Sequence, residues 1–298
     1  MLPKNHPRKI QEMIRDNFAV LILSHGRAEH MLTLDALQKC GYTGRWYIII
    51  DNEDNQESLY KEKFGEDHII VFDKLKESQE CDTCGMPYEK RNVILFARNV
   101  SFKIAKDIGL DYFLELDDDY TTFRYRYIEG NSLKTSYVTD LDSVMEAMLD
   151  FLDESGALTV AMSQTGDFMG GAGCCMLRDG HYLHRKAMNS FFCRTDRPFK
   201  FIGRINEDVN TYLNLGSRGG LFFTYALMSL NQSTTQQNKG GMTNAYLDQG
   251  TYVKSFYTVM LNPSCTKISI VGYRDFRMHH CIDWDRGVPK ILSGRFRK

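Results

Sequence analysis

The 298-residue sequence lacks several signals that mark common protein classes. It contains neither a Gly-x-x-x-x-Gly-Lys stretch nor a Gly-x-Gly-x-x-Gly turn before the first expected helix, which disfavours P-loop enzymes and dinucleotide oxidoreductases. No apolar run is long enough to cross a bilayer, and the first residues do not combine a positive start, an apolar stretch and a small-residue cleavage site. We therefore expect a cytoplasmic protein with no membrane contact.

An excess of charge of either sign is also missing. The sequence has 37 Lys and Arg against 38 Asp and Glu, a formal net charge of −1, so it is no generic polyanion binder and any nucleic-acid contact must be local. Eight cysteines without a secretory signal are expected to stay thiols. Cys81 and Cys84 form half of a zinc site, but a second pair at matched spacing is missing, which favours ordinary thiols over structural zinc.

An acidic triplet, Asp117-Asp118-Asp119, follows the apolar run at 112–116. Mg²⁺ and Mn²⁺ prefer carboxylate oxygens, and proteins commonly supply one or two of them while water and substrate phosphates complete the shell. A metal ion bound to a diphosphate is therefore our first hypothesis for this triplet. The alternative is a solvated turn that ends a strand.

Apolar runs alternate with amphipathic segments in the first part of the chain. We expect strands at 18–23, 46–50, 68–72 and 112–116, and helices at 28–39, 59–64 and 92–108. This order predicts an α/β fold with a Rossmann-like, mostly parallel, doubly wound sheet flanked by helices. Ligands bind at the carboxyl ends of such strands, where Ser24 to Arg27, Asp51 to Asp54 and the acidic triplet lie. We therefore expect these groups to line one crevice.

The second part of the chain is less regular. We expect strands at 120–127, 157–162, 174–177, 190–193 and 266–271, and helices at 142–153 and 252–260. Glycines crowd 166–173, where the backbone could approach a ligand closely, although a simple hairpin loop explains them nearly as well.

Two polar clusters occur late in the sequence. Asn206-Glu207-Asp208 lies at the expected start of a helix, where a catalytic carboxylate or ordinary helix capping would each explain it. His279 and His280 could complete a metal shell, and an imidazole ligand would favour Mn²⁺ over Mg²⁺. Core or surface histidines are the alternative for this pair.

Taken in order, these segments resemble the GT-A class of nucleotide-sugar glycosyltransferases. The resemblance rests on the strand ends at Ser24-His25-Gly26-Arg27 and Asp51, the Ala97-Arg98-Asn99 helix, the acidic triplet and Asn206-Glu207-Asp208. Four downstream segments further resemble the TET-associated glycosyltransferase family: 204–213, Gly240-Gly241-Met242-Thr243, 250–254 and 277–280. That family is associated with bacteriophage DNA hypermodification. The resemblance implies sugar transfer from a UDP-sugar to the hydroxyl of 5-hydroxymethylcytosine, or of another 5-hydroxymethylpyrimidine, in DNA.

The resemblance also implies roles for individual residues. Donor binding would involve Ser24, His25, Gly26, Arg27, Asp51, Arg98, Asp117 and Asp118, with Asp51 and the 24–27 loop around the base, Arg98 near the base or diphosphate and Asp117 facing the ribose. Asp119 would hold Mn²⁺ or Mg²⁺ together with Asp117 and His279 or His280. Asp208 would be the catalytic base of an inverting reaction, and Glu207 would orient the substrate. Because Asp118 makes the motif Asp-Asp-Asp, the two acids that face the metal stay open.

The resemblance implies one GT-A-like domain over 1–298. Residues 1–119 would bind the nucleotide sugar, of glucose or N-acetylhexosamine type, and 120–298 would form the acceptor-binding and catalytic half. The Gln-x-x-Arg-Trp motif of processive synthases is missing, which argues for single transfers. A phage-encoded enzyme would act in the host cytoplasm. The alternatives are a protein, lipid or polysaccharide acceptor, or a non-catalytic module that binds DNA or a sugar nucleotide.

Contact with DNA would need local basic or aromatic segments. The interleaved stretch at 123–127 could stack on bases, and a target base buried in a duplex would have to be flipped out. Other basic residues could contact the backbone, unless they pair with nearby acids: Arg194, Arg197, Lys200, Arg204, Arg286, Lys290, Arg295, Arg297 and Lys298.

Overall fold

The first four strands form a parallel sheet, as expected. β1 (Phe18–Leu23), β2 (Arg45–Asp51), β3 (Ile69–Phe72) and β4 (Tyr112–Asp117) lie in the order β3-β2-β1-β4, with every neighbouring pair parallel. All six residues of β1 are buried, which is typical of a strand covered on both faces. The computed structural model describes residues 14–81, 91, 93–168, 171–174, 181–182, 187, 190–232, 243–271 and 276–288.

Helices connect these strands. They are α1 (Leu32–Lys39), α2 (Glu57–Phe64), α3 (Lys74–Glu80) and α4 (Leu95–Asp107), with a 3-10 turn, η1 (Glu66–His68), before β3. The expected helices are confirmed, although their ends are shifted. For example, α1 begins four residues later than its apolar spacing indicates. α3 was not expected from the sequence. It begins at the Asp73 side chain, which accepts a hydrogen bond from the Lys76 amide.

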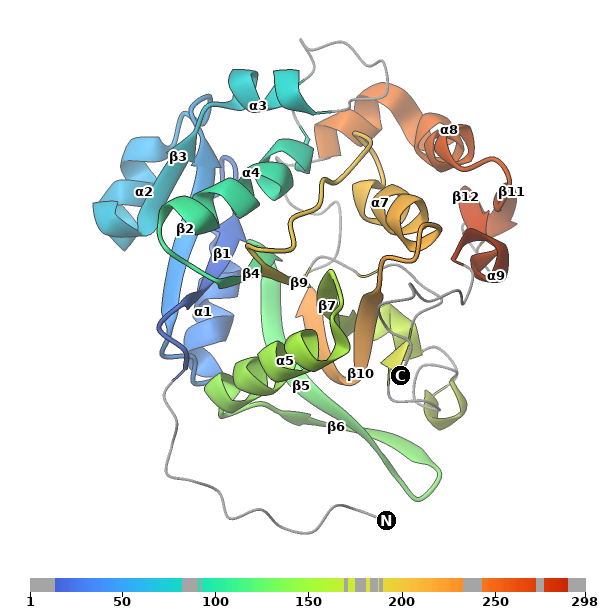
Figure 1. Ribbon diagram of the computed structural model, residues 1–298, viewed down its shortest axis with the longest axis horizontal. Helices are drawn as coiled ribbons and strands as arrows, with labels where there is room; N and C mark the ends of the chain where they lie inside the picture. The colour runs from blue at the N-terminus through green and yellow to red at the C-terminus, as the bar shows by residue number, and fades with distance from the viewer. Residues whose placement is uncertain are drawn as a thin grey trace.

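The second half of the sheet is mixed rather than parallel. Its main strands are β5 (Tyr120–Glu129), β6 (Ser132–Tyr137), β7 (Thr159–Gln164), β9 (Ser190–Arg194) and β10 (Phe222–Gln232), and β8 (His181–Tyr182) pairs with β10. β9 lies antiparallel between β4 and β7 and so joins the two halves (Figure 1). β10 is parallel to β7 and antiparallel to β5, which forms a hairpin with β6. β10 was not expected from the sequence.

The remaining elements cover the sheet or extend beyond it. α5 (Leu141–Ser155) follows β6, and two 3-10 turns, η2 (Thr165–Phe168) and η3 (Gly171–Gly173), follow β7. α7 (Glu207–Gly216) packs against α8 (Thr243–Leu261), which packs against a separate antiparallel pair, β11 (Thr266–Val271) and β12 (Arg277–Ile282). A short helix, α9 (Trp284–Gly287), follows. No helix in the ranges given above is long and apolar enough to span a bilayer.

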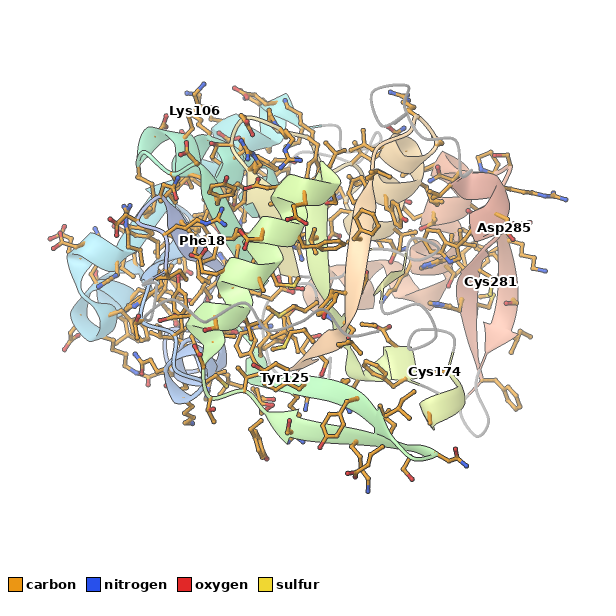
Figure 2. The ribbon with its side chains drawn as sticks, turned by 60° about the horizontal axis from the view of Figure 1, so that its bottom comes forward. Phe18, Lys106, Tyr125, Cys174, Cys281 and Asp285 are labelled. Carbon is orange, nitrogen blue, oxygen red and sulfur yellow. The ribbon has the colours of Figure 1, made fainter. Side chains whose placement is uncertain are left out.

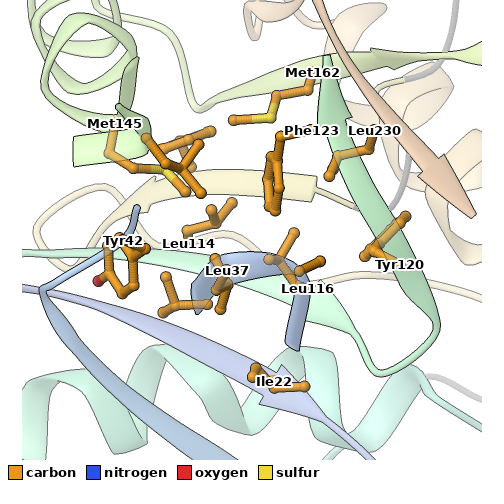
Figure 3. Packing of buried hydrophobic residues seen from close by; sticks show 14 of the residues in the cluster. Ile22, Leu37, Tyr42, Leu114, Leu116, Tyr120, Phe123, Met145, Met162 and Leu230 are labelled. Atoms are coloured by element: carbon orange, nitrogen blue, oxygen red, sulfur yellow. The ribbon is translucent and has the colours of Figure 1, made fainter. Parts of the chain in front are cut away.

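The core lies on both faces of the sheet. Successive strand residues point to opposite faces, so Val20 and Ile22 of β1 belong to one apolar cluster and Leu21 belongs to the other. Figure 3 shows Ile22, Leu37 and Phe123 in the first cluster, which α1 and α5 cover. The second cluster contains residues of α4 and α7. The end of β4 and the start of α7, which carry the acidic site described below, are therefore each anchored by residues of these apolar clusters.

Some sequence-based expectations fall outside the described residues. These are the strand at 175–177, most of the Gly240-Gly241-Met242-Thr243 segment, the basic tail beyond 288, and Cys84. Cys81 is described as a buried free thiol. The single-domain organisation stays a prediction.

Candidate functional site: an acidic crevice at the strand ends

Asp118 holds the loop that follows β1. Its carboxylate accepts hydrogen bonds from the Ser24 hydroxyl at 2.7 Å and from Arg27 Nη1 at 2.7 Å. The buried Tyr60 hydroxyl, from α2, shares a 2.7 Å hydrogen bond with Ser24 and accepts one from the Arg27 amide at 2.9 Å. The 24–27 loop and the end of β4 are therefore tied together, as the sequence predicted for a shared crevice.

Two further acids hold the other side of this loop. Asp54 accepts a hydrogen bond from the Gly26 amide at 2.7 Å, and Asp51 lies 2.7 Å from Nδ1 of His25. Lys74 places its ammonium 3.2 Å from the second oxygen of Asp51. Burial acts to raise the pKa of Asp51, but the hydrogen bond with His25 and the charge of Lys74 outweigh it and hold that pKa below its usual value. The structure thus brings Asp51 and the 24–27 loop together.

Arg98 is buried at the centre of the site. Its side chain is 1% exposed, and its three nitrogens donate to three carboxylates: Nη1 to Glu115 at 2.7 Å, Nη2 to Asp117 at 3.1 Å and Nε to Glu207 at 3.1 Å. Its guanidinium also lies 5.0 Å from the centre of the Phe191 ring. The sequence placed Arg98 beside the base or diphosphate. In the structure it connects α4, β4 and the start of α7, and its role in donor binding stays a prediction.

One guanidinium does not balance three carboxylates, of which Glu115 and Glu207 are buried and Asp117 is partly buried. Burial raises the pKa of Glu115 to about 7 and the pKa of Asp117 to about 8, although Arg98 acts in the opposite direction on both. Neighbouring carboxylates, among them Asp119 for Asp117, add to the increase. This acidic cluster therefore holds an excess of negative charge that a proton or a cation would compensate.

Asp117 and Asp119 differ from the acid between them. Asp118 is already engaged with Ser24 and Arg27, whereas Asp119 is half-buried and accepts 2.9 and 3.2 Å hydrogen bonds from the amide of Gln232. Burial raises the pKa of Asp119, and the charge of Asp118 raises it further. Alternate residues of the triplet thus belong to the acidic crevice, and the middle one belongs to the loop.

The start of α7 lies across Arg98 from the end of β4. Asn206 has a φ of 56°, in the left-handed region, and among the described residues it is the sole non-glycine with positive φ. Its side chain does not cap the helix but donates to the Lys254 carbonyl at 2.9 Å and to the Thr258 hydroxyl at 3.0 Å, both on α8. This removes Asn206 side-chain capping as the explanation of the cluster. This backbone conformation immediately precedes Glu207 and Asp208 at the start of the helix, and both of these residues are buried.

The two late histidines lie on β12. His279 and His280 have ring centroids 4.5 Å apart, and β12 packs against α8. Within the described residues, no group of three or more His, Cys, Asp or Glu side chains is arranged to hold a metal ion. The joint assignment of Asp117, Asp119, His279 and His280 to one metal ion, which the resemblance implied, stays a prediction.

The basic residues near 194–204 are occupied by internal partners. Arg194 pairs with Asp153 and Asp196, and Arg197 lies 3.6 Å from Asp153. Arg204 is buried. For Arg194 and Arg197 this outcome agrees with the alternative that these arginines pair with nearby acids, whereas Lys200 is exposed and its ammonium lies 3.4 Å from the Glu80 carbonyl.

Several site residues were not predicted from the sequence. They are Tyr60, Lys74, Glu115 and Gln232. For Glu115 a signal was present, because a charged residue in the middle of an apolar strand requires a buried partner. For Gln232 we find no signal in the sequence.

The comparison of the sequence with known families decides the assignment. The family described as TET-Associated Glycosyltransferase matches residues 18–241. The chain belongs to the TET-associated glycosyltransferase family. It is therefore a glycosyltransferase, as its sequence predicted, and its α/β fold agrees with the expected GT-A type. The matched part of this TET-associated glycosyltransferase contains the acidic triplet, Arg98, Glu207 and Asp208, whereas His279 and His280 lie beyond it.

Solved glycosyltransferase structures resemble the chain at low sequence identity. Glucosyl-3-phosphoglycerate synthase from Mycobacterium tuberculosis, in complex with Mg²⁺ and UDP, is 10% identical with a TM-score of 0.47, covering 90% of this chain and 88% of that chain. The mannosyltransferase PcManGT from Pyrobaculum calidifontis, in complex with GDP-Man and Mn²⁺, is 11% identical with a TM-score of 0.45, covering 75% of this chain and 59% of that chain. No curated protein matches the chain by sequence.

Proposed function

We propose that this protein transfers a single sugar from a UDP-sugar to the hydroxyl of a 5-hydroxymethylpyrimidine, such as 5-hydroxymethylcytosine, in DNA. Transfer would depend on Mn²⁺ or Mg²⁺ and invert the anomeric configuration. Family membership supports sugar transfer and suggests the DNA acceptor. The observation that carries the assignment of the site is the Arg98 contact set, because it joins Asp117 at the donor side to Glu207 at the start of α7.

The donor side would use the acids and the loop after β1. We assign the nucleoside to the surface formed by His25, Gly26 and Asp51, which Asp54 and Lys74 hold in place. Arg27 and Asp118 would keep this loop closed against β4. Arg98, being buried, would act as a positioning residue rather than as a diphosphate ligand.

Asp117 and Asp119 fit a divalent cation. Both supply oxygen atoms, and burial raises the pKa of both carboxyl groups, so a nearby cation would relieve the excess charge. A bound Mn²⁺ or Mg²⁺ would stabilise the negative charge of the departing diphosphate. The Gln232 amide would hold the Asp119 carboxylate in one orientation. We do not assign His279 or His280 to this ion.

Asp208 would accept the proton of the acceptor hydroxyl. It lies in the first turn of α7, where the helix dipole favours a carboxylate, and one of its oxygens accepts a 2.8 Å hydrogen bond from the Val209 amide. Glu207, fixed by Arg98, would orient the acceptor or support the position of Asp208. Attack by the hydroxyl from the face opposite the diphosphate would invert the anomeric carbon.

The test is nucleoside mass spectrometry. DNA containing 5-hydroxymethylcytosine is incubated with Mn²⁺ and each of several UDP-sugars, using the wild type, Asp208→Asn and Asp35→Asn. Asp35 is an exposed acid in the first turn of α1 and serves as the matched control. We expect a sugar-sized mass gain for the wild type and the control, reduced at least about 100-fold in Asp208→Asn.

Two outcomes would contradict different parts of the proposal. Release of free UDP without any modified nucleoside would exclude DNA as the acceptor but would still agree with a sugar transferase. Equal modification by the wild type and Asp208→Asn would remove Asp208 as the base. Analysis of the product linkage against α- and β-linked standards tests inversion directly.

A further inference from the structure

Two arginines of β5 lie on a face of the sheet that the mechanism above does not use. Arg126 is 9% exposed and donates from Nε to the Ser229 hydroxyl at 2.9 Å and from Nη2 to Asn231 Oδ1 at 3.4 Å. Its guanidinium carbon lies 4.9 Å from the centre of the Phe168 ring. Arg124, two residues earlier on the same face, is half-buried. The pair forms what we call the arginine face of β5.

The arginine face has no counter-charge among the described residues. Arg124 donates to the hydroxyls of Thr122, Thr135 and Tyr137, at 3.2, 3.3 and 3.0 Å. Its contacts, like those of Arg126, are thus all with neutral groups, whereas Arg98 and Arg194 each face carboxylates. Burial lowers the pKa of Arg126, and the charge of Arg124 lowers it further. A buried cation without an anion is costly, which indicates that a ligand supplies the negative charge.

The arginine face lies on the strand pair, β5 and β10, that ends beside the acidic cluster. Asn231, which accepts the hydrogen bond from Arg126, precedes Gln232, whose amide holds Asp119. Asn231 also accepts a 3.0 Å hydrogen bond from the Thr165 hydroxyl. An anion bound at Arg126 would therefore lie on the strand pair, β5 and β10, that leads to the proposed metal site. This position suits a polymer of which one unit reaches that site.

An aromatic ring lies next to the arginines. Tyr137 of β6 is 63% exposed, and the Arg124 guanidinium carbon lies 4.4 Å from its ring centre. Side chains alternate along β5, so Tyr125 and Tyr127 occupy the opposite face from Arg124 and Arg126. The sequence suggested that the interleaved stretch at 123–127 could stack on bases as a unit. Because its arginines and tyrosines lie on opposite faces of β5, the stretch does not form one stacking surface. Figure 2 shows Tyr125 on the hairpin of β5 and β6, at the edge of the molecule.

We propose that the arginine face binds the phosphodiester backbone of the acceptor strand next to the modified nucleotide. This inference rests on the proposed function, because it assigns the acceptor's flanking phosphate to Arg126 and Arg124. The exposed face of Tyr137 receives an adjacent unstacked base. Two guanidiniums with neutral partners match phosphate in charge and in hydrogen-bond geometry.

Binding of a fluorescein-labelled single-stranded oligonucleotide containing one 5-hydroxymethylcytosine tests this proposal. Anisotropy is measured from low to moderate salt for the wild type, Arg124→Gln, Arg126→Gln and Tyr137→Ala. Arg45→Gln is the control, because Arg45 also contacts neutral oxygens and the Tyr47 ring, but at the start of β2. We expect each β5 variant to weaken binding about tenfold and to reduce the slope of log affinity against log salt by about 0.7. Tyr137→Ala should weaken binding without changing the slope.

Further measurements separate the possible failures. Removal of a buried charge that has no counter-charge should leave the melting temperature unchanged or raised in Arg126→Gln, so a clear drop together with an unchanged salt slope overturns the proposal in favour of a structural role. A raised KM for the UDP-sugar with unchanged DNA affinity also overturns it, because the arginines would then serve the donor. If the wild type hydrolyses UDP-sugars but binds no oligonucleotide, the DNA acceptor of the proposed function itself fails.

Discussion

At the scale of single residues, Arg98 decides the arrangement of the site. A fully buried arginine is tolerated here because each of its three donor positions meets a carboxylate. Two of these partners, Glu115 and Asp117, lie on the same strand, and the third comes from a helix that begins 90 residues later. The contact set therefore fixes the distance between the end of β4 and the start of α7.

Replacement of Arg98 by methionine should destabilise the fold strongly. Two buried carboxylates and the partly buried Asp117 would lose their counter-charge, and we expect a loss of about 3–5 kcal/mol in the free energy of unfolding at pH 8. Carboxyl groups with raised pKa stabilise the folded state when protonated and lose that contribution as the pH rises through the folded pKa. The deficit should thus shrink at pH 5. Urea unfolding at both pH values measures it, with the exposed Arg218→Met as the control.

A pH-independent deficit would show that lost packing, rather than charge, explains the effect of Arg98→Met. Adding Glu115→Gln to Arg98→Met provides a second check, since it removes one of the uncompensated acids. We expect the double variant to recover part of the lost stability at pH 8.

The neighbouring acids Asp118 and Asp119 should respond oppositely to amide substitution. Asp118→Asn loses the charged hydrogen bonds to Ser24 and Arg27, so we expect it to cost about 2 kcal/mol of stability. Asp119→Asn relieves repulsion with Asp118 and should leave stability unchanged, while Mn²⁺-dependent turnover falls at least about 100-fold. Denaturant unfolding and UDP release measure the two effects. Equal loss of turnover with full stability in both variants would place Asp118 in the metal site as well.

At the scale of elements, the sequence predicted strands better than their pairing. β1 and β11 were predicted with their observed ends, and β4 with one residue missing, because continuous apolar or β-branched runs bounded by polar residues mark strands clearly. The antiparallel insertion of β9 between β4 and β7 was not predicted, because pairing of strands depends on side-chain packing across the sheet rather than on local pattern.

The docking of α7 on α8 depends on Gly203. Its φ is 86°, and a Cβ there would lie 2.9 Å from Asn210 Nδ2 and 3.0 Å from a Tyr257 ring carbon. We expect Gly203→Ala to cost about 2–4 kcal/mol, the sum of backbone strain and overpacking. Gly109→Ala is the matched control, because Gly109 has a φ of 75° with nothing within 4 Å, and should cost about 1–2 kcal/mol. Urea midpoints of the two variants compare these costs, and equal values would exclude a packing role for Gly203.

At the scale of the whole molecule, a polar cluster around Asp153 connects distant segments. Asp153, on α5, contacts Arg15 near the start of the described chain, Tyr112 of β4 and Arg194 of β9. Burial acts to raise the pKa of Asp153, but the hydrogen bonds from Arg194 and Tyr112 outweigh it and hold that pKa below its usual value. The cluster thus stabilises the fold while Asp153 is ionised.

Stability should therefore fall at acid pH through this cluster. The folded-state pKa of Asp153 is depressed, so its contribution is present above the unfolded-state pKa and is lost as the pH falls through the folded value. We expect Asp153→Asn to lose about 1–2 kcal/mol at pH 7 and to approach the wild type near pH 3. Thermal unfolding between these pH values measures the difference. A gap that persists at the acid limit would assign the loss to packing of α5.

The sequence predicted many of the residues that make up the site, but it did not predict which of them contact each other. The acids at the end of β4, the 24–27 loop and the segment from Asp51 to Asp54 were expected together, because parallel strand ends meet at one edge. The start of α7 was assigned to the same site through the family resemblance. The partners of these groups, such as Gln232 for Asp119 and Glu207 for Arg98, come from more than one hundred residues away, at separations of 113 and 109 positions. Local sequence patterns carry no information on such distant pairs, so these contacts could be seen only in the structure.

The three bonds of Arg98 also bear on how the enzyme can change. One position serves β4, α4 and α7 at once, so a substitution there alters the end of β4 and the start of α7 together. Variation toward a new acceptor is therefore constrained at this centre and freer at the hairpin of β5 and β6, where β6 pairs with β5 alone among the described strands. Directed evolution of acceptor choice should begin with libraries in that hairpin and keep Arg98 unchanged.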